Sequence, residues 1–195
     1  MSLRSPALCT LKGEIMVYVF LADGFEIIEA LAPVDMMTRA GIEVKTVGVT
    51  GELVKSSCGV SVKSDITIDE FDFYKVEAIV LPGGMPGTLN LENNTAVQRA
   101  IDNAVNIKVL ICAICAAPSI LGHKGLLSGR KATCFPGFEE ALEGAQLSDS
   151  YVVRDGNYIT ARGAGVCIDF GLEIVKYLKG GELADKIRAS IQCDD

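Results

Sequence analysis

The stretch that decides the fold is residues 109–119, VLICAICAAPS. An apolar, β-branched run leads to Cys115 and breaks at once into Ala-Ala-Pro-Ser, the pattern of a buried strand that turns tightly into a helix. Small residues flank Cys115 and permit such a turn, and Pro118 suits the first turn of a helix. We therefore predict a strand over 108–114, a helix over 116–123, and Cys115 at the corner between them.

The same alternation of strand and helix runs along the rest of the chain. Further strands are predicted at 16–22, 43–49, 59–65, 78–84 and 131–135, with a hairpin over 151–161. Further helices are predicted at 24–41, 93–106, 164–179 and 181–190. Apolar strands that alternate with helices predict an α/β fold with a mostly parallel sheet covered on both faces. We interpret residues 16–195 as a single domain and residues 1–15 as an extension that precedes it.

The composition excludes several classes of protein. The net charge is −7 and no basic face is concentrated enough for nucleic-acid binding. No apolar run approaches the roughly 18 residues of a membrane span, and residues 1–15 lack the apolar core of a secretory signal. Seven cysteines are an odd number, which favours reduced thiols in the cytoplasm. The single histidine and the absence of a second Cys-x-x-Cys pair argue against a metal site.

Two interpretations compete for the cysteine pair at 112 and 115. A redox disulfide is disfavoured because Cys112 falls inside the predicted strand, where positions three apart point to opposite faces. We interpret Cys112 as core and Cys115 as a nucleophile whose thiolate is favoured by backbone N–H groups and the following helix. His123 lies eight residues later on the same helix, roughly 12 Å away. It cannot serve as the base, and we expect it to contact the last carbonyls of that helix.

Glu29 is the candidate partner of the thiol. In the predicted helix over 24–41, Asp23 and Glu26 have the spacing of a capping box, which gives Glu26 a structural role. Glu29 sits among isoleucine, alanine and leucine, so its pKa should be raised, and a protonated carboxyl can donate a hydrogen bond to a thiolate. The alternative is a glutamate that reaches solvent.

Two glycine-containing turns are candidate binding sites for an oxyanion or another anion. Gly83 and Gly84 follow a buried strand and could let backbone N–H groups approach an oxyanion, or form an ordinary tight turn. The RGAG sequence at 162–165 opens a helix and could bind an anion or merely close a turn.

Four segments resemble one known family. ADGFEIIEALAPVDMMTRAGIEV, VLPGGMPG, ICAICAAPSIL and ARGAGVCIDFGLEIVKYL, within residues 16–190, are similar to the ThiJ/PfpI superfamily. The most similar branch contains the parkinsonism-associated deglycases and redox chaperones and their bacterial relatives. The resemblance implies a flavodoxin-like three-layer α/β/α sandwich related to class I glutamine amidotransferases. It also implies a homodimer that needs no cofactor.

The resemblance assigns roles to individual residues. It implies that Cys115 is the reactive cysteine and that Glu29 is the protonated acid that stabilises its thiolate or sulfinate. It implies that the backbone N–H groups of Gly84 and Ala116 form the oxyanion pocket. Arg39 matches an arginine near the dimer interface of the family.

One position departs from part of the family. Relatives with glyoxalase or peptidase chemistry carry a histidine in the segment that matches TCFPGF, where this chain has Phe135. This argues against a cysteine peptidase. The expected function is a glyoxalase or deglycase that acts on reactive dicarbonyls or their glycated adducts. The alternative is a non-enzymatic oxidative-stress sensor or chaperone in which Cys115 becomes a sulfinate.

Overall fold

A computed structural model describes residues 16–193, and its centre is a seven-stranded sheet of order β10-β11-β7-β6-β1-β2-β5. Its strands are β1 (Met16–Leu21), β2 (Glu43–Gly48), β5 (Ile66–Thr67), β6 (Val76–Leu81), β7 (Leu110–Ile114), β10 (Val152–Asp155) and β11 (Tyr158–Ala161). The pairs are parallel except the β10–β11 hairpin. The mostly parallel α/β sheet expected from the alternating pattern is confirmed.

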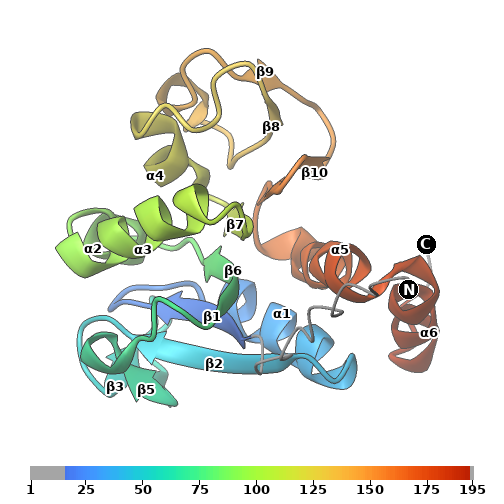
Figure 1. The fold of residues 1–195 in the computed structure, drawn as a ribbon, viewed down its shortest axis with the longest axis horizontal. Coiled ribbons are helices and arrows are strands. Elements are labelled where there is room, and N and C mark those ends of the chain that lie inside the picture. The colour runs from blue at the N-terminus through green and yellow to red at the C-terminus, as the bar shows by residue number, and fades with distance from the viewer. Residues whose placement is uncertain (1–15, 194–195) are drawn as a thin grey trace, which may run out of the picture.

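Helices cover both faces of this sheet. One face carries α1 (Ile27–Arg39), α5 (Cys167–Lys179) and α6 (Gly181–Ser190), and the other carries α2 (Gly87–Glu92), α3 (Thr95–Asn106) and α4 (Pro118–His123). Figure 1 shows α1, α5 and α6 on the right of the central strands and α2 and α3 on the left. Alternate residues of β1 enter different cores: Val17 and Val19 pack under α1 and α5, whereas Tyr18 and Phe20 pack on the opposite side.

Several predicted elements differ from the observed ones. The segment predicted as a strand at 59–65 contains β4 (Ser61–Lys63), which pairs only with β3 (Leu53–Lys55) in a separate hairpin. Its alternate residues remain exposed, so it has no buried face to place in the main sheet. The segment at 131–135 contributes only β8 (Lys131–Ala132), which pairs with β9 (Gln146–Leu147). Helix α2 was not predicted, because its six residues are too short for a periodic pattern.

Helices α3 and α4 begin two residues later than predicted, and α1 and α5 begin three residues later. Helix α1 starts at Ile27 because Gly24 adopts a positive φ of 87° and Glu26 is the N-cap residue. Helix α5 starts at Cys167 and is preceded by a short 3-10 turn over Ala164–Val166. Within the described residues, no helix is long and apolar enough to cross a membrane.

Candidate active site

The site lies at the carboxyl edge of the sheet, where β1, β6, β7 and β11 end side by side. Backbone hydrogen bonds fasten these ends together. The Glu26 amide donates to the Gly83 carbonyl at 2.9 Å, and the Cys115 amide donates to the Ala161 carbonyl at 2.9 Å. Ligands of open α/β sheets bind at this edge.

Cys115 occupies the corner directly after β7. Its φ is +65°, in the left-handed region that non-glycine residues rarely adopt. Such a conformation costs on the order of 1–3 kcal/mol and persists only where the surroundings enforce it. Here both backbone groups of Cys115 are held, since its carbonyl also accepts from the Phe135 amide at 2.8 Å. The corner is therefore held by the segments that contain Ala161 and Phe135. The helix that follows it is the short α4.

Glu29 approaches the corner from the first turn of α1. Its side chain is 1% exposed, which excludes the alternative that it reaches solvent. Its Oε2 accepts from the Gly83 amide at 3.0 Å, and its carboxyl group is hydrogen bonded to the Cys115 thiol. Burial raises the pKa of Glu29 to about 7, the direction expected from its apolar neighbours in the sequence.

Cys115 and Glu29 ionise as a pair. Burial, followed by the negative charge of Glu29, raises the pKa of Cys115 to about 12. The backbone N–H groups of Ala116 and Gly84 favour the thiolate, but they do not outweigh these effects. The expectation that the corner alone lowers the thiol pKa is therefore wrong. As pH rises through about 7 the Glu29 carboxyl loses its proton first, and the remaining proton stays on the Cys115 sulfur, from which it is directed at the carboxylate.

Gly83 and Gly84 are glycines because other atoms occupy the space of a side chain. A Cβ at Gly83 would lie 2.6 Å from the Cβ of Cys115 and 2.6 Å from Oε2 of Glu29. Gly84 has a φ of +89°, and a Cβ there would lie 2.4 Å from the Glu26 nitrogen. This close packing brings the Gly84 amide to the sulfur.

Cys112 is fully buried, and burial raises its pKa well above the ordinary value. The prediction that the two cysteines point to opposite faces is wrong. Cys115 packs against the same core cluster as Cys112, because the positive φ at the corner breaks the alternation of the strand. Both thiols are free.

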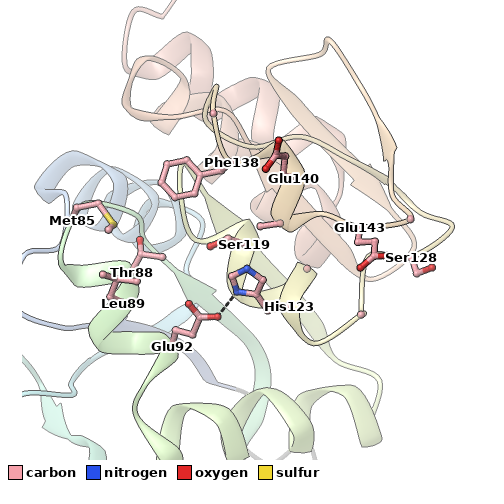
Figure 2. Close-up of a pocket in the computed structure, with 15 residues that line it drawn as sticks. Met85, Thr88, Leu89, Glu92, Ser119, His123, Ser128, Phe138, Glu140 and Glu143 are labelled. Carbon is pink, nitrogen blue, oxygen red and sulfur yellow. Dashed lines mark hydrogen bonds and ion pairs between the residues drawn. The ribbon is translucent and has the colours of Figure 1, made fainter.

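The predicted contacts of two other residues are also wrong. Asp23 does not cap α1: it accepts from the Lys55 amide, and the carboxylate of Glu26 itself accepts from the Glu29 amide at 2.7 Å. The ring of His123 contacts the carboxylate of Glu92 on α2 and not the end of its own helix. Figure 2 shows this pair. Both residues line a cavity of about 890 Å³ to which Cys115 does not contribute.

Phe135 contacts the reactive corner directly, whereas Arg39 lies at the other end of α1 from Glu29. Phe135 is hydrogen bonded to Cys115 through the backbone, and its side chain is 46% exposed. Arg39 lies in the last turn of α1, where it pairs with Asp35 at 2.9 Å on an exposed surface. Its role at an interface stays a prediction.

Two further residues lie near the site: Ala164 belongs to the RGAG turn at 162–165, which was predicted to bind an anion or close a turn, and Cys167 was missed in the sequence. The backbone of Ala164, after β11, hydrogen bonds to Glu29 and lowers its pKa. Cys167 is buried, and after burial the charge of Glu29 is the main cause that raises its pKa, to about 12. Both residues follow β11, whose carboxyl end also lies at the site, and this position in the sequence could have indicated them. Within residues 16–193 no group of three or more His, Cys, Asp and Glu side chains is placed to hold a metal ion.

Comparison with known proteins supports this architecture. Residues 16–177 match the model of the DJ-1/PfpI family. The chain is 36% identical to the Parkinson disease protein 7 homolog of Danio rerio over 184 residues, which cover 91% of this chain and 96% of the relative. It is 34% identical to deglycase PfpI of Pyrococcus furiosus over 160 residues, which cover 81% of this chain and 96% of that protein.

The fold is shared with solved structures as well. The structure of oxidized DJ-1 from Toxoplasma gondii superposes with a TM-score of 0.87 at 33% identity, over 91% of this chain and 98% of that one. The flavodoxin-like α/β arrangement expected from the resemblance is thereby confirmed. The chain belongs to the DJ-1/PfpI family.

Proposed function

We propose that the chain is a cofactor-independent enzyme of the glyoxalase or deglycase type, acting on reactive 1,2-dicarbonyls or their adducts. The observation that carries this proposal is the Cys115–Glu29 pair, a half-buried thiol hydrogen bonded to a buried carboxyl group whose pKa is about 7. A relative named a deglycase supports it. The free thiols of the described cysteines fit a reducing compartment, and we propose the cytoplasm.

The first step moves the thiol proton of Cys115 to Glu29. Sulfur of Cys115 adds to the aldehyde carbon of the dicarbonyl and forms a hemithioacetal. Glu29 holds the displaced thiol proton and delivers it to the new hydroxyl. The N–H groups of Gly84 and Ala116, which face the sulfur, stabilise the oxyanion that develops.

The second step moves a proton between adjacent carbons. Glu29 removes the proton from the former aldehyde carbon and returns one to the neighbouring ketone carbon, through an enediol. The first carbon is thereby oxidised to a thioester and the second is reduced to a hydroxyl, so no external oxidant is needed. Water then hydrolyses the thioester, which releases a 2-hydroxy acid and restores the thiol.

Turnover of methylglyoxal to lactate tests the proposal. We expect wild type to form lactate and Cys115→Ser to lose this activity. Glu29→Gln should reduce kcat by about 10²–10⁴-fold, the usual contribution of a general acid or base. Cys58→Ser is the matched control, because Cys58 is an exposed thiol outside the site. Equal rates for wild type and Cys115→Ser would refute the proposal.

A second candidate function is an oxidative-stress sensor or chaperone. It is favoured by the contact of the Cys115 thiol with Glu29, whose raised pKa lets the carboxyl take up a proton, since a carboxylic acid stabilises an adjacent sulfinate. The similar structure from Toxoplasma gondii is of an oxidized form of that protein, which adds support. Two equivalents of peroxide would each transfer one oxygen to sulfur and leave as water.

Mild peroxide treatment followed by peptide mass spectrometry tests this second function. We expect two oxygens to be added selectively at Cys115, and fewer in Glu29→Gln. Oxidation of all cysteines at similar rates would count against a sensor. Methylglyoxal turnover separates the two candidates, because a sensor without enzymatic activity forms no lactate.

A further inference from the structure

A second cavity, of about 640 Å³, lies beside the reactive corner. It is lined by Phe135, Pro136, Tyr151 and residues 162–166. A Cβ added at Gly163 would lie 3.9 Å from Cys115 Sγ and 3.2 Å from the Phe135 ring. The lining therefore begins within contact distance of the sulfur, and a group attached to Cys115 can extend into this space.

Arg162 is the one charged residue among the described residues that line this cavity. Its backbone amide donates to the Tyr151 carbonyl at 2.9 Å, and its guanidinium carbon lies 5.4 Å from the centre of the Tyr151 ring. Its Nε is buried and has no hydrogen-bond partner. Burial and the charge of Glu139 raise the pKa of the buried Cys134 to about 11, and the charge of Arg162 acts in the opposite direction.

Four other arginines of the described chain have carboxylate partners, whereas Arg99 lies over the Phe73 ring, away from the reactive corner. Arg39, Arg130, Arg154 and Arg188 pair with Asp35, Asp155, Glu173 and Asp169. Arg162 forms no such ion pair within residues 16–193. A buried donor without a partner is unfavourable, and a guanidinium is complementary to a carboxylate. The cavity thus holds one uncompensated positive charge among aromatic and small side chains.

We infer that Arg162 binds a carboxylate of the substrate, and that the substrates of Cys115 include 2-oxoaldehydes that carry a carboxylate. This inference rests on the proposed function, whose substrate class it narrows. One positive charge balances one carboxylate, whereas a doubly charged phosphate would leave a negative charge uncompensated in a chain of net charge −7. The reaction is the one described above, and its product is a 2-hydroxy dicarboxylate.

A pair of substrates that differ only in this charge provides the first test. 4,5-Dioxopentanoate carries the carboxylate, and its methyl ester is the neutral analogue. We expect Arg162→Met to lower the acid-to-ester ratio of kcat/KM by about tenfold, the order of one charge-assisted hydrogen bond. Arg154→Met is the matched control, because Arg154 also lies over a tyrosine ring but is paired with Glu173. An unchanged ratio in Arg162→Met would overturn the inference.

Alkylation of Cys115 tests the same contact without turnover. Iodoacetate and iodoacetamide react alike, since sulfur displaces iodide in both, but only iodoacetate carries a carboxylate. We expect the iodoacetate-to-iodoacetamide rate ratio at Cys115 to fall about tenfold in Arg162→Met and to stay constant at the exposed Cys58. An equal ratio at Cys115 in both proteins would contradict the inference. If wild type forms no product from any dicarbonyl, the proposed function fails while this ratio still decides the role of Arg162.

If Arg162→Met does not fold, the carboxylate site can be tested with wild type alone, by protection of Cys115 from alkylation. Propionate should slow the alkylation of Cys115 by iodoacetamide, and the neutral analogue propionamide should not. Equal protection by the two compounds, or protection by neither, would overturn the carboxylate site.

Discussion

At the scale of single residues, the site depends on the burial of Glu29, which raises the pKa of its carboxyl group. Its carboxyl group is removed from water on a helix face, where neighbouring isoleucine, alanine and leucine side chains leave it with Cys115 and backbone amides as partners. The sequence predicted the direction of this effect, because an acid among apolar residues loses hydration when the helix packs. It also predicted Cys115 as a partner, but not the backbone groups of Gly83 and Ala164, which depend on how three strand ends meet.

The raised pKa of Glu29 makes stability depend on pH. The folded chain binds this proton more tightly than the unfolded chain, so the stabilisation is complete below the unfolded value of 4.5 and is lost as pH rises to about 7. Across this range the free energy of unfolding of wild type should fall by about 3 kcal/mol relative to Glu29→Gln. Denaturant unfolding of both proteins at several pH values measures it. A difference that does not change with pH would show that Glu29 is not buried as described.

At the scale of elements, the junction of β6 and β7 depends on Gly83. A side chain at position 83 would overlap with the side chains of Cys115 and Glu29. We expect Gly83→Ala to displace the pair, to destabilise the fold by about 1–3 kcal/mol, and to lower methylglyoxal turnover more than its effect on folding explains.

Gly181→Ala is the matched control for this junction. Gly181 opens α6, and a Cβ there would meet nothing within 4 Å, so this variant should retain stability and activity. Circular dichroism and turnover assays distinguish the two variants. Full activity of a folded Gly83→Ala would contradict the close packing.

The elements also show where sequence patterns are informative. Strands β1, β6 and β7 were predicted because their continuous apolar runs match the burial of a central parallel strand. The hairpin β3–β4 was misplaced because a three-residue strand with alternating exposure does not reveal which sheet it joins. Cys115 was located correctly at the corner, whereas its φ of +65° and its packing against the same core as Cys112 follow from tertiary contacts.

At the scale of the whole molecule, we propose that the chain forms a homodimer. Exposed apolar side chains occur on α1, at Ile28, and on the β3–β4 hairpin, at Leu53 and Val60. Such side chains are commonly covered by a partner. Size-exclusion chromatography with light scattering should give twice the chain mass of 20.7 kDa. Charge reversal at Arg39 should weaken the dimer, and a monomeric wild type would contradict the proposal.

The central claim is that Cys115 and Glu29 act as one ionising pair. The rate of Cys115 alkylation by iodoacetamide, followed by peptide mass spectrometry across pH, tests it most directly. Because partial burial and the negative charge of Glu29 raise the pKa of Cys115 to about 12, wild-type reactivity should stay low near neutral pH and rise only toward that value. In Glu29→Gln the negative charge is gone, so the rise should move to lower pH, but it should stay above the ~8.5 of an ordinary thiol because burial still disfavours the thiolate. A pH profile that Glu29→Gln leaves unchanged would contradict the account.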